Sequence, residues 1–197
     1  MLEEYKTIGS SVESELRELG SRFLTFLFPI SDAAEFQSIL KSLKTTYYDA
    51  SHHCSAYRLA TEPVTEKSSD DGEPGGTAGL PMLNALRSAE LFQVGAVVVR
   101  YFGGTKLGTR GLIDAYGGAV VEAIAEAQCI HVVPQLEWSV TLPFDQLGLL
   151  QQNMGKIGGL SISGNDYHPN GLTTHLKGKK DAIEQLKSAL ERWTIHD

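Results

Sequence analysis

"VGAVVVRYF", from Val94 to Phe102, is a near-continuous apolar run that contains one charged residue, Arg100. A half-exposed strand would carry a polar residue at every second position, so this pattern predicts a β-strand that is covered on both faces. Other parts of the chain are therefore expected to cover this strand on each side.

The segment after this strand predicts a long helix. A glycine-rich loop, GGTKLG, comes first, and apolar residues then recur at helical spacing from Thr109 to Gln128. Gly117 and Gly118 interrupt the apolar stripe, although glycine inside a helix costs about 1 kcal/mol relative to alanine. We expect close packing against a neighbour at these two positions, where a side chain would clash.

The segments before the strand predict two further strands and two helices. Strands are expected at Ser21–Ile30 and Ala50–Ala60, where β-forming or alternating residues gather. Helices are expected after Ser31 and Thr77, whose hydroxyl groups can cap a helix N-terminus. From Thr61 to Gly76 the chain is polar and carries prolines and glycines, which predicts a long loop.

Pro134 predicts a domain boundary, which divides the chain into residues 1–133 and 134–197. The second part has the order strand, helix, strand, strand, helix, with Asp145 as the cap of its first helix and a last helix from Asp181 to Trp193. This order predicts a small antiparallel sheet with both helices on one face.

Composition and charge narrow the range of possible functions. The chain has 197 residues, of which 42% are hydrophobic, and a formal net charge of −7 at pH 7. Before Pro134 there are 11 basic and 17 acidic residues, and after it 6 and 7. Affinity for a polyanion comes from Lys and Arg that displace counterions, so this balance disfavours non-specific nucleic-acid binding. A local basic patch is still compatible with it.

The sequence predicts a cytoplasmic protein that does not enter a membrane. It has no run of 18 or more apolar residues, and its polar, acidic N-terminus lacks the pattern of a secretory signal. In a reducing compartment, Cys54 and Cys129 are expected to be two buried thiols rather than a disulfide.

The segment GGTKLGTRG, Gly103 to Gly111, joins the buried strand to the long helix. It lacks the Gly-Lys-Ser/Thr ending of a phosphate-binding loop, which argues against a nucleotide hydrolase. Free amides at the start of the helix, with Lys106 and Arg110 nearby, could still hold one anionic group. Alternatively, the glycines only permit a tight turn.

A second glycine-rich segment, SDDGEPGGTAGLPML from Ser69 to Leu83, contains Asp70, Asp71 and Glu73. Their spacing does not match a calcium loop, and no nucleophile accompanies them for acid–base catalysis. A solvated turn would explain any one of these acidic residues. It would not explain why so many glycines and prolines stand beside them in one segment. Residues 52–54, His-His-Cys, alternate on a strand, so at most two could meet one ion, and no metal site is predicted.

Three blocks of the sequence resemble the IMPACT/YigZ family. They are YYDASHHCSAYRL, SSDDGEPGGTAGLPML and VVVRYFGGTKLGTRGLIDAYGGAV, and they follow the family order. The resemblance implies an α+β chain, with an N-terminal α/β sandwich similar to the fourth domain of elongation factor G and a C-terminal ferredoxin-like domain similar to its fifth. Where relatives usually show GTGGLVRAYG, this chain has GTRGLIDAYG, so Arg110 and Asp114 depart from the pattern.

The resemblance also implies a role in translation, because eukaryotic relatives are translation regulators. We expect a binding module that docks on RNA or on a ribosomal or other translation protein, without a cofactor or metal. The alternative is an enzyme that acts on a small anionic or phosphorylated substrate, and the oligomeric state stays open. The segments Asp70–Gly76 and Arg100–Gly108 are expected to lie together at one end of the N-terminal sheet. The residues of this expected site are Asp70, Asp71, Gly72, Glu73, Pro74, Arg100, Tyr101, Phe102, Gly103, Gly104, Lys106 and Arg110.

Overall fold

The apolar run forms the central strand of a five-stranded sheet. In the computed structural model, which describes residues 2–192 and 194, this strand is β6, Val94–Tyr101, and its residues are buried as far as Arg100. The strand order is β2-β3-β6-β4-β5, and all neighbours pair antiparallel. The other strands of the sheet are β2 (Val12–Glu18), β3 (Ser21–Pro29), β4 (His52–Leu59) and β5 (Thr65–Ser69).

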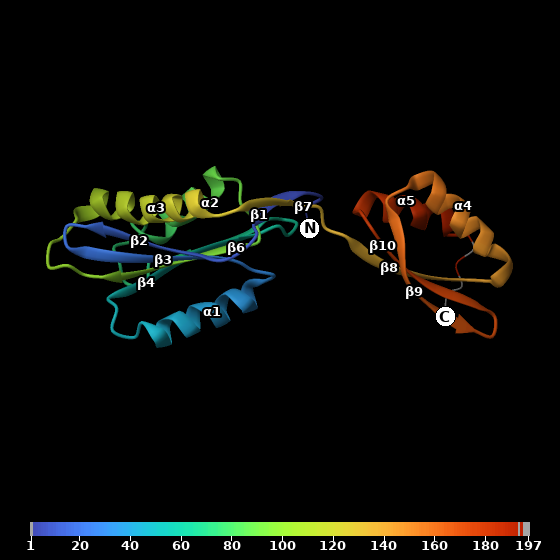
Figure 1. Ribbon diagram of the computed structural model, residues 1–197, viewed down its shortest axis with the longest axis horizontal. Coiled ribbons are helices and arrows are strands. Elements are labelled where there is room, and N and C mark those ends of the chain that lie inside the picture. Colours follow the sequence, from blue (N-terminus) through green and yellow to red (C-terminus); the bar gives the residue numbers. More distant parts are fainter. Residues whose placement is uncertain (1, 193, 195–197) are drawn as a thin grey trace. The chain divides into compact units, whose positions relative to one another are not determined.

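Helices cover both faces of this sheet, as the apolar run predicts (Figure 1). Helix α1, Ala33–Thr46, packs on one face, where Phe36 joins a cluster with Val97 and Val99 of β6. The other face carries α2 (Gly79–Ser88) and α3 (Gly108–Glu126). Alternate residues of β6 therefore point to α1 or to the α2/α3 layer.

The chain divides into two units, Met1–Val132 and Val133–Asp197. A two-stranded antiparallel sheet of β1 (Tyr5–Ile8) and β7 (Cys129–Val132) belongs to the first unit. Cys54 is a buried free thiol as expected, but Cys129 is exposed, which corrects the prediction of two buried thiols. Within the described residues, no helix combines the length and the apolar character needed to cross a membrane.

The second unit confirms the predicted small antiparallel sheet with helices on one face. Its strands lie in the order β8-β10-β9, and both helices share one hydrophobic cluster with the sheet through residues such as Leu150, Leu176 and Ile183. Together with the first unit, this gives the expected α+β fold. Its elements are β8 (Leu136–Leu142), α4 (Leu147–Ile157), β9 (Leu160–His168), β10 (Gly171–Gly178) and α5 (Lys180–Leu190).

Helix starts differ from the prediction. Asp32, not Ser31, caps α1, because its Oδ1 accepts hydrogen bonds from the N–H groups of the second and third residues that follow it. Thr77 does not cap α2; its hydroxyl donates to the carbonyl of Pro74 at 2.7 Å. Asp145 lies in a short 3₁₀ turn, and no side-chain hydrogen bond caps α4. Local sequence identifies a polar residue near a helix start, but not which one has the right geometry.

Two predicted boundaries also change. The predicted loop from Thr61 to Gly76 contains β5, an edge strand that pairs only with β4 and is too polar to be recognised from its sequence. The last helix ends at Leu190, and the predicted final residue, Trp193, lies outside the described residues.

Gly117 and Gly118 of α3 do not have the packing role that the sequence predicts. A Cβ added at Gly117 would lie 3.7 Å from Cβ of Pro81, which is an ordinary contact. A Cβ added at Gly118 would have no heavy atom within 4 Å. Both positions therefore have room for a side chain.

We expect Gly118→Ala to raise the free energy of unfolding by about 0.5–1 kcal/mol, because alanine loses less conformational entropy than glycine in a helix. Urea unfolding followed by circular dichroism measures this. As a control, Gly103→Ala should destabilise, since its Cβ would lie 1.9 Å from the carbonyl carbon of Gly20. A loss of stability in Gly118→Ala would contradict the open space seen beside it.

Candidate functional site

Asp70, directly after β5, organises the loop that leads into α2. Its Oδ1 accepts hydrogen bonds from the backbone N–H groups of Ala78 (3.0 Å) and Gly79 (2.8 Å), and its Oδ2 accepts one from Gly76 (2.9 Å). Burial opposes ionisation of this carboxyl group, but the three N–H donors outweigh it and lower its pKa. Asp70 therefore caps α2. It lies farther from the helix start in the sequence than a local capping residue does, so no capping pattern identifies it.

Asp71 attaches the same loop to α1 and β4. Its Oδ1 accepts a hydrogen bond from Nζ of Lys44 at 2.7 Å, and its Oδ2 accepts one from the backbone N–H of His53 at 2.7 Å. Burial again opposes ionisation, yet Lys44 and the His53 N–H lower the pKa of Asp71. The next residue, Gly72, has a φ of +92°, a conformation that glycine adopts readily.

Glu73 and Arg100 form a buried ion pair that joins the loop before α2 to β6. Nη1 of Arg100 lies 2.5 Å from Oε1 of Glu73, and the two residues are only 4% and 9% exposed, respectively. Tyr116 of α3 donates its hydroxyl to the same carboxylate oxygen at 2.8 Å. Nη2 of Arg100 also donates to Oγ of Ser21 at 3.3 Å. This cluster links the loop before α2 to β6, α3 and β3.

Strand alternation explains why these groups meet. His52 of β4 lies directly opposite Arg100 in the register of the sheet. Because side chains alternate along a strand, His52 lies on the same sheet face as Cys54, and Arg100 lies on the same face as Val98. Cys54 and Val98 pack in the α2/α3 layer. Burial raises the pKa of the Cys54 thiol to about 12, so this group stays protonated at neutral pH and is a poor nucleophile.

The second glycine-rich loop presents side chains outside this buried cluster. Gly103 packs directly on the backbone of Gly20, and its N–H donates to Oγ of Ser21 at 3.2 Å. Phe102 is 49% exposed, and the guanidinium carbon of Arg100 lies 5.5 Å from the centre of its ring. Lys106 is exposed and forms no ion pair with any other described residue. This loop therefore offers a ring and a cation to solvent.

The other residues of the predicted site lie outside the buried cluster or make only local contacts. Tyr101 faces the α1 layer, and its hydroxyl donates to Asp49 at 2.8 Å. Arg110 pairs with Asp114 at 2.9 Å on the exposed surface of α3, where such a pair contributes little stability. Pro74 supplies a carbonyl to Thr77, and Gly104, with a φ of +86°, is exposed. Among the described residues, no group of His, Cys, Asp and Glu is placed to hold a metal ion.

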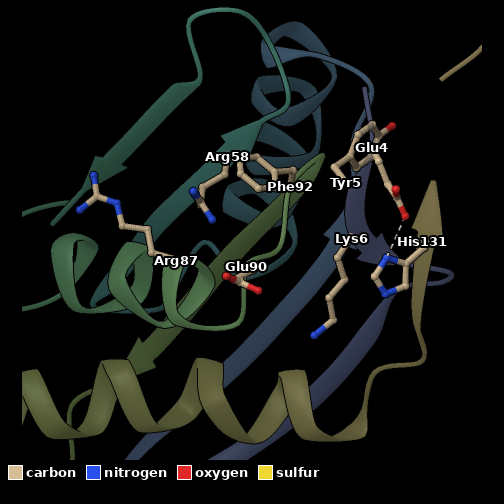
Figure 2. A pocket seen from close by; sticks show the side chains of 8 residues that line it. All are labelled: Glu4, Tyr5, Lys6, Arg58, Arg87, Glu90, Phe92 and His131. Carbon is tan, nitrogen blue, oxygen red and sulfur yellow. Dashed lines mark ion pairs between the residues drawn. The ribbon is translucent and has the colours of Figure 1, made fainter. Parts of the chain in front are cut away.

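Sequence reasoning missed a pocket of about 550 Å³ on the first unit, which Figure 2 shows. Its lining side chains come from several elements, among them β1, β4, α2 and β7, so no local motif joins them. Arg58 stacks on Phe92 at 4.1 Å, and both Arg58 and Arg87 pair with Glu66. The pocket thus carries cations and carboxylates together. The ionisable side chains that line it include Glu4, Lys6, Arg58, Arg87, Glu90 and His131.

Polar side chains also gather on the sheet of the second unit. Nδ1 of His175 lies 2.6 Å from Oγ of Ser139, and its Nε2 lies 2.8 Å from Oδ2 of Asp166. The three residues come from three neighbouring strands, which is why their sequence spacing carries no signal. Ser139 and Asp166 are exposed and His175 is half-buried, and Ser139 also lines a pocket of about 440 Å³ together with Trp138 and residues of α5.

Comparisons with known proteins place the glycine-rich segments in a family region. A family model described as the Impact N-terminal domain matches residues 19–124. IMPACT family member YvyE of Bacillus subtilis is 44% identical over 124 residues, which are 63% of this chain and 57% of that protein. IMPACT family member YigZ of Escherichia coli is 36% identical over 149 residues, 75% of this chain and 72% of that protein.

A solved structure resembles the whole chain. A crystal structure of a hypothetical protein matches with a TM-score of 0.70 and 29% sequence identity, and the match covers 98% of this chain and 93% of that one. In sequence, by contrast, the match to YvyE spans less than two thirds of that relative's length.

Proposed function

The chain belongs to the IMPACT family, and from this premise we propose that it is a translation-associated binding protein. It docks on RNA or on a ribosome-linked protein through the polar loop surface, defined here as residues 70–76 and 102–106. The family resemblance supports this role, because eukaryotic relatives are translation regulators and the resemblance implies two units similar to domains of elongation factor G.

The buried pair of Glu73 and Arg100 is the observation that carries the proposal. It ties the loop of residues 70–76 to the end of β6, the strand from which residues 102–106 continue. A surface whose loops are held by the protein core loses little conformational entropy when a partner binds. The pair therefore acts as a support under the surface, and the exposed residues above it make the contacts.

The roles of the acids favour binding over catalysis. Asp70 caps α2, Asp71 holds Lys44 and the His53 N–H, and Glu73 is bound by Arg100 and Tyr116. Each carboxylate is thus engaged within the chain, whereas a general acid or base must reach a substrate. The exposed groups are Phe102 and Lys106, and an aromatic ring beside a cation suits the bases and phosphates of single-stranded RNA.

The test is co-sedimentation of the full chain with purified ribosomes and with single-stranded RNA over a range of salt concentrations. Lys106→Glu should weaken binding about threefold or more at low salt and flatten its salt dependence, because one phosphate contact is lost. Lys41→Glu is the matched control, since Lys41 is exposed on α1 and is not a residue of the polar loop surface.

Two results would contradict the proposal. One is a chain that stays out of the ribosomal and RNA-bound fractions even at low salt. The other is equal weakening by Lys106→Glu and Lys41→Glu, which would indicate an effect of net charge alone. Turnover of a small anionic substrate that Asp71→Asn abolishes without loss of folding would instead favour an enzyme.

A further inference from the structure

A groove of about 420 Å³ lies between α3 and the end of β2, in the first unit. Apolar side chains form its floor, namely Leu16 of β2, and Leu107 and Ala115 at and within α3. Two exposed carboxylates of its rim, Glu18 and Glu122, have no cation partner among the described residues. The groove thus combines an apolar floor with an acidic rim, and we call it the acidic groove.

The charge of the rim has one sign. Asp114 is the third rim carboxylate and pairs with Arg110 outside the groove. Neither Lys nor Arg is among the described residues that line the acidic groove. This differs from the pocket of Figure 2, where cations and carboxylates occur together. A ligand in the acidic groove therefore meets uncompensated negative charge above an apolar surface.

The acidic groove is also open to close approach. Gly118 belongs to its wall, and a side chain added there would meet no heavy atom within 4 Å. Leu19, at the turn after β2, lines the groove and is 55% exposed. In addition, β3 is the only strand of the described residues that pairs with β2, so the outer backbone groups of β2 have no strand partner there. These features describe a surface whose apolar part is unpartnered in the isolated chain.

We propose that the acidic groove is a docking site for a basic amphipathic segment of a partner protein. Aliphatic side chains of the segment bury Leu16, Leu19 and Leu107, and its Lys or Arg residues pair with Glu18 and Glu122. Charge complementarity decides the class of partner, because the rim repels nucleic-acid phosphates and attracts cations. The inference goes beyond the proposed function, since the acidic groove shares no residue with the polar loop surface.

The probe for the test is a fluorescein-labelled 14-residue peptide of Lys and Leu whose leucines share one helix face. Binding to the full chain is measured by fluorescence anisotropy and located by amide chemical shifts. Gly118→Leu should weaken binding at least about tenfold, because the new side chain fills the groove. The double variant Glu18→Gln, Glu122→Gln should weaken it about threefold to tenfold, as expected for two exposed charge contacts.

Matched controls separate the groove from general charge attraction. Glu13→Gln should leave binding unchanged, because Glu13 lies on the opposite face of β2, across from Phe26 of the α1 layer. A scrambled peptide of the same composition, without an apolar face, should bind at least about tenfold more weakly. Circular dichroism checks that Gly118→Leu is folded, and the Glu18, Glu122 double variant gives a second measurement if it is not.

Three outcomes would overturn the proposal. One is a scrambled peptide that binds as tightly as the amphipathic one, and another is a set of shifted amides that lie outside residues 16–19 and 107–122. The third is self-association of the chain that Gly118→Leu abolishes, since the occupant would then be a second copy. Shifts confined to those residues, with loss of binding in Gly118→Leu and in the double variant, would support it.

Discussion

Glu73→Ala is expected to lower the free energy of unfolding of the first unit by about 3–5 kcal/mol, because it leaves the buried guanidinium of Arg100 without a counter-charge. It also removes the acceptor of the Tyr116 hydroxyl, which is fully buried. The change therefore affects two buried polar groups at once.

The distribution of tryptophan makes this measurable in the full chain. Both tryptophans, Trp138 and Trp193, belong to the second unit. Urea unfolding followed by circular dichroism should show an earlier transition for Glu73→Ala, while tryptophan fluorescence, which reports the second unit, stays unchanged. A shift of both signals would mean that the units unfold together.

A graded series of variants tests whether the loss of the counter-charge to Arg100 causes the destabilisation. Tyr116→Phe removes one hydrogen bond and leaves the ion pair, so it should lower the free energy of unfolding by about 1–2 kcal/mol. Glu73→Gln keeps an acceptor oxygen but loses the charge. Its loss of unfolding free energy should therefore lie between those of Tyr116→Phe and Glu73→Ala. Equal small losses in Glu73→Ala and Tyr116→Phe would show that Arg100 finds another partner or water, and would remove the support proposed under the polar loop surface.

Asp70→Ala is expected to lower the free energy of unfolding by about 2–3 kcal/mol at pH 7, because three backbone N–H groups at the start of α2 lose their acceptor. Asp32→Ala is the matched control on α1. It removes an aspartate that caps from the usual position and accepts two N–H groups, so a smaller loss of about 1 kcal/mol is expected.

The pH dependence of Asp70→Ala follows from its lowered pKa. A carboxyl group whose pKa is lower in the folded than in the unfolded state stabilises the fold above its unfolded pKa, about 3.9 for Asp. That contribution disappears as the pH falls through the folded pKa. The stability difference between wild type and Asp70→Ala should therefore be constant above about pH 5 and shrink below about pH 4. A difference that is independent of pH down to about pH 2 would contradict the assignment of the cap to an ionised carboxylate.

The central elements were predictable because their sequences carry strong local patterns. The apolar run of β6 and the helical period of α3 identify both elements within a few residues. The edge strands were not predictable: VESELRE of β2 and TEKSS of β5 are polar and have neighbours on one side only. Their strand conformation comes from pairing with β3 and β4, which no local pattern reports.

The candidate site, too, was predictable only in part from the sequence. The sequence singled out Asp70, Asp71 and Glu73 as an unusual group, but it could not separate a helix cap, a link to α1 and a buried counter-ion. Arg100 was recognised as the charged residue of an apolar run, and its counter-charge lies 27 residues away in the chain. Tyr116, which completes the cluster, read only as a member of an apolar stripe.

The sequence by itself predicted the buried strand β6 and the strand and helix order of the second unit, and it carries the IMPACT blocks. Only the tertiary structure decided the partner of each polar side chain and the acidic groove beside β2. The reason is physical: periodicity records which face of an element avoids water, and it can be read from neighbours in sequence. A hydrogen bond or ion pair depends on distances of a few ångströms between segments that packing brings together, and those distances exist only in the folded chain.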